Sequence, residues 1–169
     1  MKILSNLFLC ALLLCALSAC QKDVVQPITV QGKWEVTAAS CQDGIQTIHE
    51  NGSTRGGAFV FEGQSFSTEV EFKSDATFKG FGNYTKIFST LENGTMKNYQ
   101  FEANDFANEG EWGKNDVQLE LIHNEVEKFE IIDLTSHKII LKFDLNETIE
   151  NNNRTTQNVG TVYYNLRRK

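Results

Sequence analysis

Apolar and polar side chains alternate along a stretch near the start of the chain, from Val30 to Ala38. Every second residue in it is apolar or small, and the residues between are polar or charged. A period of two is typical of a β-strand with one buried and one solvated face. Trp34 offers the largest burial in this stretch, and Gly32 precedes it on the same face. The pattern therefore predicts a first strand whose tryptophan anchors the core.

Short apolar or alternating segments recur through the rest of the chain. Asp-Gly and Asn-Gly dipeptides, which favour tight turns, lie between some of them at 43–44, 51–52 and 93–94. The segments are 58–61, 65–73, 77–88, 95–101, 117–121, 129–131, 138–145 and 159–166. Almost no helical period occurs after the first twenty residues. We therefore expect about eight to ten antiparallel strands joined mostly by short turns.

An up-and-down meander of this kind must protect its two edge strands, and closure into a barrel removes them. We therefore predict an all-β fold in which the meander closes into a barrel, with an open β-sandwich as the alternative. Two glycines on one face of the segment 78–88 indicate strong bending or a close backbone approach. The polar segments 104–110 and 146–158 are predicted to be loops at the mouth of this barrel.

The first twenty residues have the pattern of a targeting signal. Lys2 gives a positive start, residues 7–17 form an apolar run, and Leu17-Ser18-Ala19-Cys20 ends it. The run is shorter than the ~20 residues that a membrane span needs. Its ending resembles the lipobox of bacterial lipoproteins, which implies cleavage before Cys20 and acylation of that cysteine, with palmitate among the acyl chains. An ordinary secretory signal or a transmembrane anchor is the alternative.

These features divide the chain into three parts. We expect a lipoprotein signal peptide at 1–19, a lipidated tether at 20–29 and one β-barrel domain at 30–169. The formal net charge of −6 repels phosphate groups, which argues against nucleic acid as a partner. Without the signal and the acylated cysteine, Cys41 is the one remaining thiol, so we expect no internal disulfide.

Side chains that carry common enzyme chemistry do not form a recognisable constellation in this sequence. His49, His123 and His137 lie in separate turn-like segments without a second metal ligand at suitable spacing. The carboxylate pairs at 69/71 and 125/127 are expected on solvated faces. We therefore expect no catalytic residues, no cofactor and no metal.

Short motifs in a common order resemble the lipocalin-like lipoproteins of the Bacteroidota. Gly32-Lys33-Trp34 is similar to the family's Gly-x-Trp signature on the first strand. The segment 72–78 is similar to a hairpin that usually has Gly where Ala76 stands. Segments 129–141 and 163–168 resemble the late hairpin and the closing strand.

This resemblance spans about residues 30–169 and implies a specific contact at one end of the barrel. In lipocalins a basic side chain from near the end of the chain packs across the signature tryptophan, which is a cation–π contact. Alternation along the last strand places Arg168, rather than Arg167, on the inner face. We therefore expect Gly32, Trp34 and Arg168 to pack together at the end of the barrel.

The resemblance also predicts a binding protein. Twelve phenylalanines can fill a solid core or line a cavity, and barrels of about eight strands lie at the border between these cases. We expect a monomer, lipid-anchored to the outer membrane on its periplasmic or outer face, that binds a small apolar or amphipathic ligand. The candidate cavity-lining residues are Phe72, Phe78, Leu121 and Phe143. A solid-core module that displays loops to a protein or glycan is the alternative.

Overall fold

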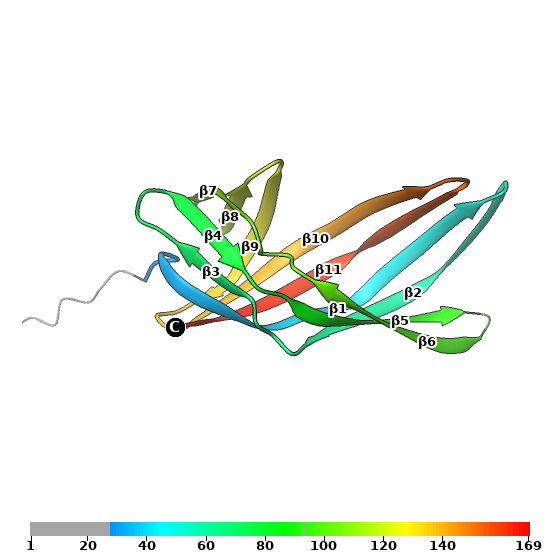
Figure 1. Ribbon diagram of the computed structural model, residues 1–169, viewed down its shortest axis with the longest axis horizontal. Coiled ribbons are helices and arrows are strands. Elements are labelled where there is room, and N and C mark those ends of the chain that lie inside the picture. Colours follow the sequence, from blue (N-terminus) through cyan, green and yellow to red (C-terminus); the bar gives the residue numbers. More distant parts are fainter. Residues whose placement is uncertain (1–27, 93) are drawn as a thin grey trace, which may run out of the picture.

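The computed structural model describes residues 28–92 and 94–169, and all its regular structure is β-strand (Figure 1). The expected signal peptide, Cys20 and most of the tether lie outside these residues. The strands are β1 (Gly32–Glu50), β2 (Ser53–Gln64), β3 (Glu69–Phe72), β4 (Thr77–Phe81), β5 (Tyr84–Glu92), β6 (Thr95–Ala103), β7 (Glu109–Lys114), β8 (Gln118–Ile122), β9 (Val126–Leu134), β10 (Lys138–Asn151) and β11 (Arg154–Arg168). The predicted all-β class is confirmed.

Eight of these strands close into an antiparallel barrel. The hydrogen-bonded order runs β11-β10-β9-β8-β7-β4-β3-β1, and β1 pairs with β11 to complete the ring. Each strand of the ring therefore has a hydrogen-bonded neighbour on both sides, and the ring has no edge strand. The predicted closed barrel is confirmed, and the open sandwich is excluded.

The sheet divides at β1, and this division shapes the rest of the molecule. β11 occupies one edge of β1 from Trp34 to Glu50. The other edge is shared, because Gly32–Glu35 pair with β3 whereas Ser40–Glu50 pair with β2. β2 continues to β5 and β5 to β6, outside the closed ring. The long halves of β10, β11, β1, β2, β5 and β6 thus extend away from the barrel as a curved, open sheet (Figure 1).

The segment 78–88, which the sequence presents as one strand, is two strands with different neighbours. It is interrupted at Gly82, whose φ is +85°, so that β4 belongs to the ring and β5 to the open sheet. A Cβ at Gly80 would lie 1.7 Å from the carbonyl oxygen of Phe106. The predicted close backbone approach is confirmed, because the segment 104–108 crosses directly against β4.

The predicted loop at 146–158 is wrong, because this segment is the far end of the β10–β11 hairpin. The two strands stay paired from Glu147 with Asn158 to Asn151 with Arg154. The turn lies at 152–153, where Asn152 has a positive φ of 52°. At this height both faces of the hairpin are polar or solvated, so the residues carry no apolar period that would identify strands.

The closed ring has a solid core at the end near both described termini. The side chains that fill it are Trp34, Phe72, Phe78, Leu119, Leu121, Ile139, Leu141 and Leu166, each at most 2% exposed. The ring of Phe72 packs against those of Phe78 and Trp112, with centroids 6.5 and 5.6 Å away. An eight-stranded barrel is just wide enough for side chains to fill it, which explains why no space remains here.

Trp34 seals this end of the barrel together with Arg168. The indole is fully buried, and its Nε1 donates a hydrogen bond of 2.7 Å to the carbonyl oxygen of Val30. The guanidinium carbon of Arg168 lies 4.2 Å from the centroid of the Trp34 ring. The structure therefore shows the cation–π contact that the family resemblance implied.

Gly32 leaves the space that Arg168 occupies. The two terminal nitrogens of Arg168 donate hydrogen bonds of 2.8 and 2.7 Å to the carbonyl oxygens of Gln31 and Thr29. A Cβ at Gly32 would lie 2.5 Å from Arg168 Nη1, and φ at this residue is +125°. Glycine is therefore required here by both the contact and the backbone conformation.

Cys41 is a structural thiol at a bulge in β1. Its side chain is buried, and burial raises the pKa of the thiol above its ordinary value. Sγ lies 3.6 Å from Asp43 Oδ1, and the same oxygen accepts a 2.8 Å hydrogen bond from the backbone N–H of Thr161. Since the thiolate is the nucleophilic form, a shielded thiol of raised pKa is unreactive.

Candidate functional site

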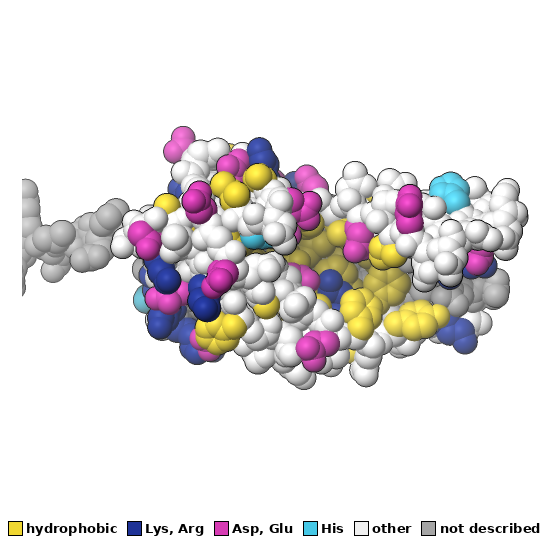
Figure 2. Space-filling view, turned by 45° about the horizontal axis from the view of Figure 1, so that its top comes forward, with side chains coloured by type: hydrophobic (Ala, Val, Ile, Leu, Met, Phe, Trp, Pro, Cys, Tyr) yellow, Lys and Arg dark blue, Asp and Glu magenta, His cyan; other side chains and the backbone are white. Residues whose placement is uncertain are grey.

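A large cavity lies beside the solid core, where the sheet is open. Its volume is about 1250 Å³, and its walls come from β1, β2, β5, β6, β9, β10 and β11. Figure 2 shows the hollow, with hydrophobic side chains on its floor and acidic side chains near its border. Small-molecule sites commonly have volumes of roughly 300–1000 Å³, so this cavity has room for a ligand the size of a lipid.

The cavity opens to solvent between two strand edges that have no neighbour within the described ranges. β6 pairs with β5, and no other described strand pairs with it. β10 pairs with β9 up to Lys142, and residues 143–151 pair with β11 alone. The walls of the cavity on these two sides are therefore strand edges rather than a continuous sheet.

One wall of the cavity is aromatic and comes from the three strands outside the ring. The residues concerned are Phe59 and Phe61 on β2, Phe88 on β5, and Tyr99 and Phe101 on β6. The rings of Phe59 and Phe88 stack with centroids 4.8 Å apart. Phe59 and Phe61 are buried, whereas Tyr99 and Phe101 are 46% and 47% exposed. The two exposed rings offer apolar area that a ligand can cover.

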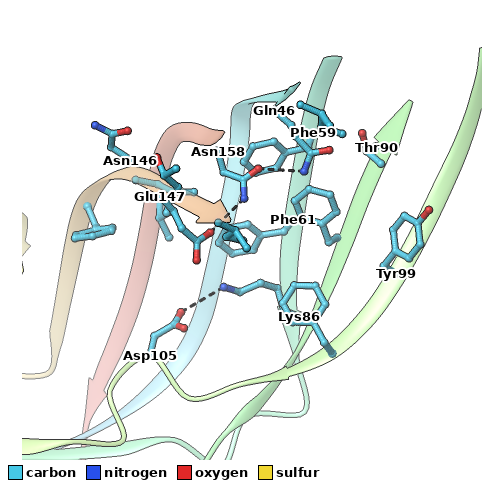
Figure 3. A pocket seen from close by; sticks show the side chains of 18 of the residues that line it. Gln46, Phe59, Phe61, Lys86, Thr90, Tyr99, Asp105, Asn146, Glu147 and Asn158 are labelled. Atoms are coloured by element: carbon cyan, nitrogen blue, oxygen red, sulfur yellow. Dashed lines mark hydrogen bonds and ion pairs between the residues drawn. The ribbon is translucent and has the colours of Figure 1, made fainter. Parts of the chain in front are cut away.

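The opposite side of the cavity carries polar groups in register across three strands. Asn158 on β11 is 7% exposed and lies between Gln46 on β1 and Glu147 on β10 (Figure 3). Its Oδ1 accepts a 3.0 Å hydrogen bond from Gln46 Nε2, and its Nδ2 donates one of 3.2 Å to Glu147 Oε2. Figure 3 shows Tyr99 and Glu147 on opposite sides of the cavity, so that an aromatic wall faces a wall in which polar groups are mixed with apolar side chains such as Phe143 and Leu145.

Asp105 lies at the floor of the cavity and accepts hydrogen bonds from two tyrosines. The hydroxyls of Tyr84 and Tyr164 both donate to Oδ2, at 2.5 and 2.7 Å. Burial, reinforced by the neighbouring Asp105 charge, raises the pKa of both tyrosines far above the ordinary value. Both phenols therefore keep their protons at any physiological pH and remain donors.

Lys86 is the inward-pointing cation of this floor. Its Nζ lies 3.7 Å from Asp105 Oδ2, as the dashed line in Figure 3 marks. The same ammonium lies over three rings, 4.5 Å from the centroid of Phe61, 5.8 Å from that of Tyr84 and 5.9 Å from that of Phe101. The floor thus consists of a paired charge within an aromatic surround.

The β8–β9 hairpin contributes two carboxylates to the lining, Glu125 and Glu127. Glu127 Oε2 lies 3.4 Å from His123 Nε2, and burial raises the pKa of Glu127 although His123 acts against this. The His123 side chain is only 13% exposed. His123 lies in a turn-like segment of the sequence, but the hairpin shields its side chain from most of the solvent.

The sequence-based lining residues divide between the cavity and the core. Phe143 lines the cavity. Phe72, Phe78 and Leu121 do not, because they are buried in the closed ring. Strand alternation identifies inward-pointing residues, but it says nothing of their height along the barrel, and only the open part contains free space.

Sequence reasoning missed the residues that form the floor. Lys86 shares its strand face with Tyr84 and Phe88, and a lysine on an apolar face is a signal that was available. Asp105 lies in a segment that the sequence identifies as a loop, and no local pattern marks it. Its position depends on Phe106, which is 1% exposed and packs on Phe129 and Tyr164, with centroids 5.7 and 5.0 Å away.

Among the described residues, metal-binding clusters and membrane-spanning helices give no second candidate functional site, and neither do the comparisons with known proteins. Among residues 28–92 and 94–169, no three His, Cys, Asp or Glu side chains are arranged to hold a metal ion. The same residues contain no helix long and apolar enough to cross a membrane. No family model matches the chain, no curated protein matches it, and no solved structure matches it.

Proposed function

We propose that this chain is a lipid-anchored, lipocalin-like protein of the cell envelope that binds a small amphipathic molecule. The observation that supports the proposal is the cavity of about 1250 Å³, which has an aromatic wall on one side and polar groups among apolar side chains on the other. Covering apolar surface contributes roughly 25 cal/mol per Å², which favours a ligand with an apolar part of substantial area. The polar side orients the other end of the ligand, and no covalent step is involved.

The membrane anchor is a separate part of this proposal, and it is based on the segment Leu17-Ser18-Ala19-Cys20. Acylation of Cys20 would hold a monomeric barrel at the outer membrane, on the periplasmic or the outer face. A Cys20→Ala variant should leave the membrane fraction, whereas Cys15→Ala, within the apolar run, should remain there. Retention of the Cys20 variant in membranes would argue against acylation.

Binding of a neutral apolar dye to residues 21–169 tests the ligand-binding proposal. We expect N-phenyl-1-naphthylamine to bind saturably and to be displaced by octanol. Phe101→Ala should weaken dye binding roughly fivefold, because a half-exposed ring contributes about 1 kcal/mol when a ligand covers it. Native mass spectrometry of the purified protein provides an independent check for ligands that copurify.

Phe81→Ala is the matched control for this experiment. Phe81 is 52% exposed, close to the 47% of Phe101, but it does not line the cavity. Its replacement should leave the affinity for the dye unchanged. A folded domain without saturable binding, or equal losses in both variants, would contradict the proposal and would favour an interaction module instead.

A further inference from the structure

We infer that the cavity selects ligands whose polar end is an organic cation, such as an alkylammonium or quaternary ammonium group. The inference rests on the proposed ligand-binding function and adds the charge of the ligand to it.

Carboxylates outnumber Lys and Arg side chains in the lining by four to three, and two of the carboxylates, Glu125 and Glu147, are exposed to the solvent that fills the cavity. The carboxylates are Asp105, Glu125, Glu127 and Glu147. Lys86 is the one cation that points to the floor in the described part of the chain. Arg55 and Arg154 also line the cavity, but they lie close to the hairpin turns at its rim, and Arg55 is paired with Glu50 at 3.1 Å.

These carboxylates are not all balanced within the protein. Lys86 and two tyrosine hydroxyls satisfy Asp105. Glu147 accepts a hydrogen bond from the neutral amide of Asn158, and no Lys or Arg of the described residues lies within ion-pair distance of it. Glu127 lies 3.4 Å from His123, and this contact is an ion pair only when the imidazole is protonated. Among the described residues, the Glu147 charge is therefore left without a cationic partner, while Arg154, which has no carboxylate partner either, lies beside the hairpin turn at 152–153.

A ligand that fills the cavity removes water from these carboxylates. Desolvating a carboxylate without a compensating partner is costly, and a neutral ligand leaves that cost in place. A ligand anion is repelled by these carboxylates as well. The Lys86 ammonium does not offset this repulsion, because it is already paired with Asp105. A cation offsets the cost directly. The formal net charge of −6 on the whole chain produces a field of the same sign.

The aromatic surround also suits a cation, as Lys86 itself shows. Its ammonium is held 4.5 Å from the centroid of Phe61 and close to a carboxylate, so the floor accommodates an organic cation by the same chemistry. Along β10 an apolar run leads to the Glu147 carboxylate, which a ligand cation can reach. Phe143 and Leu145 precede Glu147 on one face of β10, and all three line the cavity.

Titration with three octyl compounds that differ in the head group tests this inference. We expect octyltrimethylammonium to displace the neutral dye from residues 21–169 at a roughly tenfold lower concentration than octanol. Octanoate should be the weakest of the three. Glu147→Gln keeps an acceptor for Asn158 and removes the charge. It should weaken binding of the cation roughly fivefold and leave octanol unaffected.

Asp144→Asn is the matched control, because it removes one negative charge from the same strand. The Asp144 side chain is 83% exposed and does not line the cavity, so the affinity for the cation should not change. Equal affinity for octanol and the cation, or equal losses for both ligands in Glu147→Gln, would overturn the inference and leave the proposed function standing. Failure of all three compounds and of the dye to bind would overturn the proposed function as well.

Discussion

Replacing Trp34 by alanine is expected to lower the free energy of unfolding by about 3 to 5 kcal/mol. The indole is fully buried within the closed ring, so its removal leaves a large cavity. The carbonyl oxygen of Val30 also loses its hydrogen bond, and Arg168 loses the ring on which it packs. Denaturant unfolding of residues 21–169, followed by circular dichroism, measures the change.

Trp112 provides the matched control for this substitution. It is only partly buried at the side of the same core, where it packs on Phe72 and donates a 3.0 Å hydrogen bond to the carbonyl oxygen of Lys73. Trp112→Ala should therefore cost less than Trp34→Ala. An equal or greater loss at Trp112 would mean that Trp34 does not anchor the barrel.

Replacing Asp105 by alanine is the second change with a large expected effect, a loss of about 3 kcal/mol in the free energy of unfolding. The substitution removes the acceptor of the Tyr84 and Tyr164 hydroxyls and leaves Lys86 without its counter-charge. The side chains of Asp105 and Lys86 are 27% and 18% exposed, so solvent compensates for only part of this loss. The same unfolding measurement applies.

A double-mutant cycle with Tyr84→Phe separates this network from a general loss of packing. Tyr84→Phe alone removes one donor and should cost about 1 kcal/mol. Once Asp105 is alanine, the hydroxyl has no carboxylate to bind, so the second substitution should cost much less. Strict additivity of the two losses would show that the hydroxyl and the carboxylate do not act together.

The closure of the barrel could be predicted from the sequence because it depends on local patterns. Alternation along Val30–Ala38 identified the first strand, and alternation near the chain end placed Arg168 on the inner face. The first and last strands are expected to pair because this pairing removes both edges of the meander. The structure shows this pairing, with Trp34 of β1 opposite Arg168 of β11.

The cavity could not be predicted in the same way, because it depends on how the strands are ordered in space. β1 pairs with β3 in one half and with β2 in the other, and no residue pattern within β1 marks this change. This change of partner places β2, β5 and β6 outside the ring, where their aromatic side chains form one wall of the cavity. Phe72 and Phe143 both point inward, but only Phe143 lies in the open part.

The central claim is that the ligand space lies beside the solid core, between the outer strands and the β10–β11 hairpin. Amide NMR spectra of isotopically labelled residues 21–169, titrated with octyltrimethylammonium, test it most directly. We predict saturable shifts in β2, β5, β6 and the far halves of β10 and β11, with the Trp34–Arg168 end unaffected. Shifts confined to that sealed end, or no saturable shifts in a folded domain, would contradict the claim.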